Sequence, residues 1–160
     1  MIKENLSPKN KEWNGYLITT DPRKMQVNAI HQWLATKSHW AINIPFDTVK
    51  GMVENSFCIG VFTKDNLQIG FARLITDYVV FAYLADVYIE KEHRGKGLSK
   101  MMMDMMMEEE WVQNLRRLFL ATKDAHKLYE KYGFSKLRYP ERMMEVFKED
   151  AYAKVANQKQ

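Results

Sequence analysis

The hydrophobic period of the chain changes twice between residues 57 and 122, and this change restricts the fold more than any other feature. Three runs rich in β-branched and aromatic side chains are separated by turn signals and predict a meander of strands at residues 57–63, 68–77 and 81–90. A helical period over residues 98–111 and a short strand at residues 118–122 follow. Because a strand–helix–strand crossover joins parallel strands, the sequence predicts a mixed sheet, mostly antiparallel with one parallel pair.

The segments on either side add helices to this sheet. A strand at residues 16–20 ends at Asp21-Pro22, an N-cap followed by proline, which predicts a helix carrying Met25, Ala29, Ile30, Trp33 and Leu34. A second helix is expected near Asp47, and a last helix over residues 124–131, followed by strand-like runs at residues 134–137 and 142–147. We therefore expect an α+β fold, a three-layer α/β sandwich with helices on both faces of the sheet.

Length and composition predict one domain that needs neither disulfides nor metal. At 160 residues and 46% hydrophobic, the chain can bury one core, so we expect a single domain over residues 1–160, with its core at residues 13–148 and polar arms at both ends. The single cysteine, Cys58, cannot form an internal disulfide or a structural zinc site, and we expect it to pack inside. Within the helix at residues 98–111, Leu98, Met101, Met102, Met105 and Met106 fit one buried stripe.

Charge and hydropathy exclude several function classes. No apolar run reaches the roughly 20 residues that span a bilayer, and the charges within residues 1–5 do not suit a secretion signal, so we expect a cytoplasmic protein without membrane partners. The net charge of +4 comes from 24 Lys and Arg against 20 Asp and Glu. Because no basic stripe with interleaved aromatic residues accompanies it, we expect no nucleic-acid partner.

The chemistry is concentrated at residues 84–100, where a strand passes through a glycine-flanked basic loop into a helix. The first N–H groups of a helix lack intrahelical partners and carry partial positive charge, so they can bind a phosphate. Gly95 and Gly97 let the backbone approach such a ligand, and Arg94, Lys96 and Lys100 add positive charge. The pattern predicts a pyrophosphate site that is not a P-loop; the alternative is a tight turn with a solvated basic face.

Two motifs resemble those of the GNAT N-acetyltransferases. Residues 87–100 run from a strand into R-G-K-G and a helix, as in that family's acetyl-CoA motif, and residues 125–134 read A-H-K-L-Y-E-K-Y-G-F, similar to its A-x-x-L-Y-E-K-x-G-F helix. The order of elements from residue 16 to residue 147 resembles the family's whole fold. Two positions depart from the family: Glu92 stands where Gln or Arg is frequent, and Thr122 where Asn is frequent.

The resemblance implies transfer of an acetyl group from acetyl-CoA to a primary amine by direct attack within a ternary complex, without a metal. Tyr129 would face the CoA sulfur and protonate the leaving thiolate, although it could instead only pack the last helix. A backbone N–H near Val87 would polarise the thioester carbonyl. The remaining contacts implied for acetyl-CoA are with Val87, Tyr88 and Ile89 along the pantetheine arm, with Arg94, Gly95, Lys96, Gly97, Leu98 and Ser99 around the pyrophosphate, and with Thr122.

The proton acceptor and the amine are less defined. Asp86 is our first candidate for the general base because it stands in an apolar strand just before the cofactor segment; an exposed or salt-bridged strand residue is the alternative. His126 and Asp77 are weaker candidates. In this family the early helices border the acceptor pocket, which would bring Trp33, His39, Trp40 and Phe46 to the acceptor, unless these side chains pack the core.

Two other classes of protein fit the same sequence. One is a module that binds CoA without catalysis, and the other is a protein-interaction domain that keeps the fold. The first would keep the phosphate loop but needs no Tyr129, whereas the second needs neither. In either case an exposed strand edge at residues 142–147 would support a homodimer.

Overall fold

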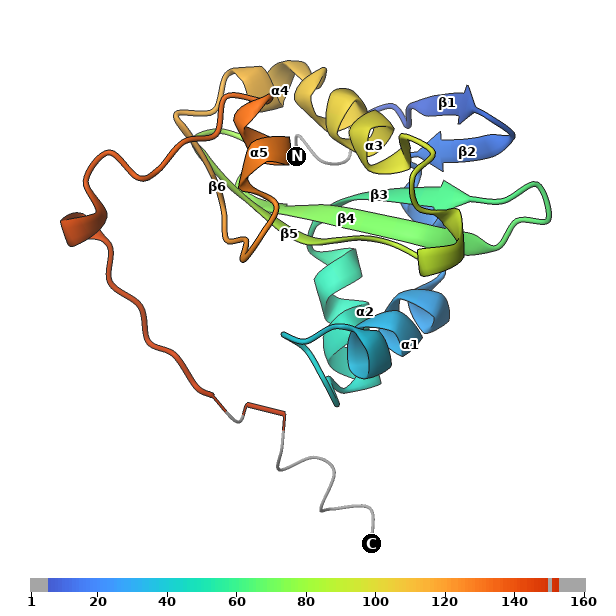
Figure 1. Ribbon diagram of the computed structural model, residues 1–160, viewed down its shortest axis with the longest axis horizontal. Helices are drawn as coiled ribbons and strands as arrows, with labels where there is room; N and C mark the ends of the chain where they lie inside the picture. Colours follow the sequence, from blue (N-terminus) through green and yellow to red (C-terminus); the bar gives the residue numbers. More distant parts are fainter. Residues whose placement is uncertain (1–5, 150, 153–160) are drawn as a thin grey trace, which may run out of the picture.

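The computed structural model describes residues 6–149, 151 and 152, so the expectations for the extreme ends, residues 1–5 and 153–160, lie outside the described residues. A six-stranded sheet runs through the centre in the order β1-β2-β3-β4-β5-β6 (Figure 1). Its strands are β1 Asn10–Trp13, β2 Tyr16–Thr19, β3 Phe57–Phe62, β4 Gln68–Thr76, β5 Phe81–Ile89 and β6 Arg117–Leu120. All neighbours are antiparallel except β5 and β6. The predicted meander and the single parallel crossover are confirmed.

Helices cover both faces of the sheet, as predicted (Figure 1). On one face lie α1 Val27–Lys37 and α2 Phe46–Glu54, and on the other lie α3 Leu98–Met107, α4 Glu110–Gln113 and α5 His126–Glu130. Each face buries its own apolar cluster, one between the sheet and α3 and one under α1 and α2. The result is a three-layer α/β sandwich.

The methionine-rich helix α3 packs as the sequence predicts. Leu98, Met101, Met102, Met105 and Met106 are all buried, and Met103 is buried as well. Flexible thioether side chains fill irregular space well, which suits a helix that is buried over most of its surface. Cys58, in β3, is buried as expected. No helix in the part of the chain that the structure describes is long and apolar enough to cross a membrane.

Two predicted helix boundaries were wrong, and one strand was missed. Asp21 does cap a turn, but this turn is a short 3-10 helix, Pro22–Lys24, and α1 begins only at Val27. The helix predicted over residues 98–111 breaks after Met107, and the short α4 follows. β1 was missed because its residues are polar, yet Asn14-Gly15 behind it is a hairpin signal, and both of these residues have positive φ.

The strands predicted at residues 134–137 and 142–147 are absent from the described structure. Residues 135–149, here called the C-terminal arm, form no strand, and every one of them is exposed. The arm contains one 3-10 turn, Pro140–Arg142, and runs away from the body beyond α5 (Figure 1). β propensity acts through packing against neighbouring strands, and this segment lies beside none within the described chain.

Candidate active site

The sheet opens between β5 and β6. Their pairing ends at Leu84 and Leu120, where β6 stops, whereas β5 continues to Ile89. The pairing of β4 with β5 also shifts register between Phe71 and Arg73, so that β5 has one extra residue there. The extra residue produces a β-bulge beside Asp86, whose φ of 55° is in the left-handed region. Because β6 ends at Leu120, the β5 backbone beyond Leu84 has no strand partner on its β6 side within the described residues.

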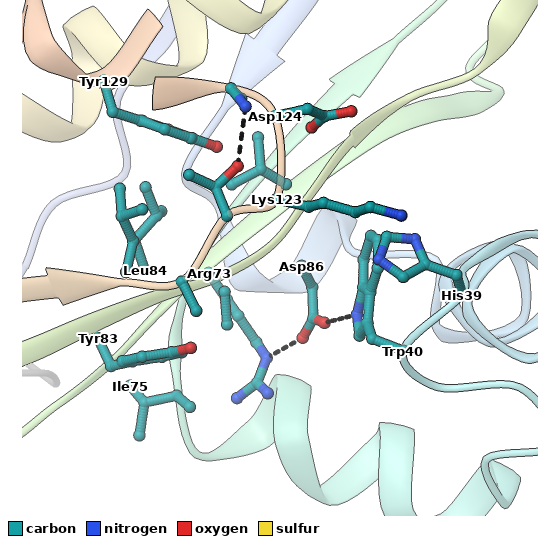
Figure 2. A pocket seen from close by; sticks show the side chains of 16 residues that line it. His39, Trp40, Arg73, Ile75, Tyr83, Leu84, Asp86, Lys123, Asp124 and Tyr129 are labelled. Atoms are coloured by element: carbon teal, nitrogen blue, oxygen red, sulfur yellow. Dashed lines mark hydrogen bonds and ion pairs between the residues drawn. The ribbon is translucent and has the colours of Figure 1, made fainter. Parts of the chain in front are cut away.

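A pocket of about 680 Å³ fills this opening. Its floor is β4 and β5, one wall is the loop from β6 to α5, and the opposite wall is the loop after α1 (Figure 2). Asp86, Val87, Thr122 and Tyr129 all line it, so the structure gathers four of the predicted site residues from three separate stretches of sequence into one place. Arg73 and Tyr83 also line the pocket, and sequence reasoning did not identify them.

Tyr129 reaches the pocket from α5. Its side chain is buried, and its hydroxyl points into the cavity (Figure 2). Burial raises the pKa of Tyr129 above the usual value, so the hydroxyl keeps its proton at neutral pH. The Thr122 hydroxyl accepts a hydrogen bond from the N–H of Ala125 at 3.1 Å and fixes the turn that leads into α5. This turn orients Tyr129 toward the sheet.

Asp86 is an ion-paired residue of the pocket floor. Its Oδ2 lies 2.6 Å from Nε of Arg73, and its Oδ1 accepts a hydrogen bond from Nε1 of Trp40 at 2.9 Å (Figure 2). The Arg73 and Asp86 side chains are 11% and 6% exposed, so water screens the pair little. Arg73 also donates to the Ser56 hydroxyl at 3.1 Å. The salt-bridged alternative left open by the sequence is therefore the observed state of Asp86.

The glycine-rich loop has the geometry of an anion site. Gly95 and Gly97 have φ values of 75° and 78°, which favour glycine. Gly97 caps α3, and the first intrahelical bond runs from the N–H of Met101 to its carbonyl. The N–H groups of the three preceding residues, Leu98, Ser99 and Lys100, therefore have no partner within the helix. They form a cluster of donors at the positive end of the helix dipole.

The β1–β2 hairpin braces this loop, a feature that the sequence did not reveal. Nε1 of Trp13 donates to the carbonyl of Lys96 at 3.0 Å. Nζ of Lys96 donates to the Tyr16 hydroxyl at 2.7 Å, and that hydroxyl lies 2.8 Å from Nδ1 of His93. On the other side, Nε of Arg94 donates to the carbonyl of Ile89 at 2.8 Å. These contacts fix the loop on both sides. The side chains of Arg94 and Lys96, which were predicted to add positive charge to the site, take part in them.

Two of the predicted acceptor contacts line the pocket and two do not. His39 and Trp40 lie in its wall, with their rings edge-to-face at 4.9 Å. Trp33 is buried and stacks on Tyr88 at 3.9 Å between ring centres, so it packs the core. Phe46 packs against His31 and is not among the residues that line the cavity.

The weaker base candidates lie elsewhere. Asp77 sits in the β4–β5 turn, where Oδ1 accepts hydrogen bonds from the N–H groups of Val79, Val80 and Phe81. These bonds lower the pKa of Asp77, and they explain its presence without catalysis. His126 is exposed at the start of α5 and does not line the pocket. Among the described residues no group of three or more His, Cys, Asp or Glu side chains could hold a metal ion.

Comparison with solved structures gives the class of protein. A structure from Xanthomonas campestris pv. campestris, assigned to the GNAT family of acetyltransferases, matches with a TM-score of 0.84 and 40% identity over 89% of this chain and 99% of that one. An acetyltransferase structure from Deinococcus radiodurans shares the fold alone, with a TM-score of 0.68 and 16% identity over 89% of this chain and 95% of that one. The architecture is that of GNAT acetyltransferases.

Sequence comparison agrees. The family profile described as "Acetyltransferase (GNAT) domain" matches residues 55–136. A protein of Gibberella zeae that carries the name acetyltransferase is 34% identical over an alignment of 144 positions, which covers 78% of this chain and 81% of that protein. The chain belongs to the GNAT family of acetyltransferases.

Proposed function

We propose that this protein transfers the acetyl group of acetyl-CoA to a primary amine, by direct attack of the amine within a ternary complex. One observation carries the proposal: the Tyr129 hydroxyl and the unpaired β5 backbone around Val87 face the same pocket. An acid and a carbonyl-polarising N–H within one cavity are what thioester aminolysis requires. A module that only binds CoA needs neither group in that position.

The backbone supplies the proposed sites for the acetyl donor. The pyrophosphate would accept hydrogen bonds from the amides of Gly95 to Ser99, where Gly95 and Gly97 hold the loop in its left-handed turns. The amide of Arg94, which the sequence also placed in this set, already donates to the carbonyl of Lys91 at 3.3 Å. The pantetheine arm would pair with Val87, Tyr88 and Ile89 in the way that an added strand pairs with a sheet edge. β5 is open to such pairing because β6 ends at Leu120.

The bond changes assign a role to Tyr129. The amine nitrogen attacks the thioester carbonyl carbon, a C–N bond forms, and the C–S bond breaks when the tetrahedral intermediate collapses. The sulfur leaves as a thiolate and takes the proton of the Tyr129 hydroxyl. Because burial raises the pKa of Tyr129, the hydroxyl stays protonated before the C–S bond breaks and can then donate its proton to the sulfur.

The amine must lose a proton, and Asp86 remains our proposed acceptor. Each of its two oxygens accepts one hydrogen bond, from Trp40 or from Arg73. A carboxylate has about four acceptor sites, so room for a further donor is left on each oxygen. His39 is a second candidate, because its ring lines the same pocket and an imidazole nitrogen can accept a proton.

Calorimetric titration with acetyl-CoA, CoA and dephospho-CoA is the first test. We expect micromolar binding of acetyl-CoA and CoA, because the donor cluster at α3 favours the pyrophosphate that they share. Release of free thiol in the presence of amines of different size and charge then tests transfer. Binding without thiol release by any amine would support the CoA-binding alternative, and absence of binding would support the interaction-domain alternative.

A further inference from the structure

A row of apolar side chains crosses three strands and begins inside the pocket. Ile75 of β4 pairs with Tyr83 of β5, and Tyr83 pairs with Phe119 of β6. Paired residues of neighbouring strands point to the same face of a sheet, so these three side chains, here called the apolar row, lie next to one another. Ile75 and Tyr83 also line the pocket, and Phe119 continues the row beyond it.

The apolar row lies on the face of the sheet that carries α1 and α2, yet these helices do not bury it. Arg73, two residues before Ile75, pairs with Cys58, which belongs to the cluster under α1 and α2. Because side chains alternate along a strand, Ile75 points to the same face as Arg73. Ile75 is nevertheless 41% exposed, and Phe81, which follows the same face of β5, is 40% exposed. Within the described residues, the row is therefore an open apolar surface that continues from the pocket.

The polar groups of the pocket are at its other end. Figure 2 shows Ile75 and Tyr83 side by side at one end, Asp86 and Trp40 toward the other, and Arg73 between them. Tyr83 and Asp86 are three residues apart on β5, which corresponds to a separation of about 10 Å along an extended strand. Pockets of this kind use a few polar groups to orient a ligand and apolar side chains to hold its body. A ligand whose amine lies at Asp86 has its body over the apolar row.

The charges of the pocket lining favour a body without a second positive charge. Arg73 and Lys123 line the pocket together with Asp86 and Asp124, so these charges balance. The Asp86 carboxylate already lies 2.6 Å from Nε of Arg73. A second ammonium group on the body of the acceptor would lie beside the Arg73 guanidinium and over three side chains that carry no charge, where nothing offsets the repulsion. This arrangement disfavours a polyamine.

We propose that the acceptor is a primary amine joined by a short alkyl chain to an aromatic ring, and that this ring lies on the apolar row. The substrate class rests on the proposed acetyl transfer: the amine becomes an N-acetyl amide, CoA leaves as the free thiol, and the proton of the amine passes to the base. The ring packs on Tyr83 and Ile75, where contact between aromatic rings adds to the burial of apolar surface. Tyr83 and Ile75 determine specificity and take no part in the bond changes.

Calorimetric titration with phenethylamine and with ethylamine, in the absence and in the presence of CoA, tests the row directly. We expect phenethylamine to bind at least about tenfold more tightly, because only this amine has a ring to bury. Tyr83→Ser and Ile75→Ser, two neutral changes at partly exposed positions, should each weaken its binding at least about threefold. The matched control is Leu67→Ser, at a 61% exposed apolar position beyond the opposite end of β4, which should leave binding unchanged. Equal affinity for the two amines, or no binding of phenethylamine, would overturn the proposal.

Thiol release from acetyl-CoA with phenethylamine, ethylamine, spermidine and glucosamine 6-phosphate tests the class of acceptor. We expect the highest kcat/KM for phenethylamine, and we expect Tyr83→Ser to lower the ratio of kcat/KM for phenethylamine to that for ethylamine at least about threefold. A change that only disturbs the fold would lower both values and leave this ratio unchanged. Preference for spermidine or for the phosphorylated sugar would overturn the substrate class while acetyl transfer stands. If no amine releases thiol, acetyl transfer itself fails, and the calorimetric comparison alone decides whether the row binds an aromatic amine.

Discussion

Replacement of Asp86 by asparagine separates the two roles that this residue can have. The change removes the charge but keeps the shape, and asparagine tolerates the positive φ at this position nearly as well as aspartate. The amide oxygen can still accept the hydrogen bond from Trp40. What is lost is the anion 2.6 Å from Nε of Arg73.

The loss should be visible in stability. Removal of one partner of a buried ion pair costs about 3–5 kcal/mol, because the remaining charge is left uncompensated. The Arg73 side chain is only 11% exposed, so little solvent screening reduces this cost, while its bond to Ser56 offsets part of it. We expect a loss near the lower bound, about 3 kcal/mol. For a chain of this size, this corresponds to roughly 6–12 °C in Tm.

Urea unfolding followed by tryptophan fluorescence measures the loss, with Arg73→Gln and the double variant completing a cycle. The double variant should lose less than the sum of the single variants, because neither charge is then left alone. A loss for Asp86→Asn below about 1 kcal/mol would refute the argument that the pair is buried and coupled. Turnover is measured at a temperature where both single variants are folded: a fall of about 100-fold or more for Asp86→Asn that Arg73→Gln, which breaks the same ion pair, does not share identifies Asp86 as the proton acceptor. An unchanged kcat leaves it as a structural residue, and His39→Gln is then the next variant.

The other predictions concern Gly97 in the glycine-rich loop, the proposed acid Tyr129, and Asp77 in the β4–β5 turn. Gly97→Glu should weaken acetyl-CoA binding at least about tenfold in calorimetry, because a carboxylate would enter the donor cluster, whereas Gly97→Ala, which shares the strained φ of 78° without the charge, should weaken it less; equal effects would contradict the anion site. Tyr129→Phe should lower kcat by about 100-fold with the Kd for acetyl-CoA nearly unchanged, and an unchanged thiol-release rate would remove Tyr129 from the mechanism. Asp77 has a pKa held below the usual value by backbone N–H groups, so its contribution to stability is present above the unfolded pKa and is lost as pH falls toward the folded one. Urea unfolding at pH 7 and near pH 3 should therefore show a smaller loss on acidification for Asp77→Asn than for the wild type, and parallel losses would contradict this.

The sequence predicts the fold well where the signals are local. Hydrophobic period identifies β3 to β5 and α3, and the strand–helix–strand crossover then predicts that β6 pairs parallel to β5. It fails at residues 142–147, where strand-forming side chains meet no neighbouring strand in the described chain. A high β propensity therefore indicates that a segment can pair within a sheet, but it does not indicate that a partner strand is present.

The site is predictable only in part, for a similar reason. The sequence predicted the roles of Gly95 and Gly97, because a phosphate-binding loop needs backbone conformations that glycine adopts most easily. Their positive φ values agree with this prediction. The ion pair of Asp86 with Arg73 does not follow, because it depends on a register shift between β4 and β5. In a regular antiparallel ladder, side chains alternate between the two faces of the sheet. One extra residue in β5 therefore decides to which face of the sheet the Asp86 side chain points. No local pattern in the sequence of β5 predicts the extra residue.

The β-bulge in β5 affects both the position of the Asp86 side chain and the unpaired backbone around Val87. The extra residue beside Asp86 interrupts the ladder to β4, and on the other side β6 has already ended at Leu120. Backbone groups around Val87 are thus withdrawn from sheet pairing at the point where the Tyr129 hydroxyl enters the pocket. A strand that loses ladder bonds must be stabilised otherwise, and the buried contacts of Asp86 with Arg73 and Trp40 do this by tying β5 to β4 and to the loop after α1. A substitution that weakens these contacts is therefore expected to disturb the geometry around Val87 as well as the stability of the fold.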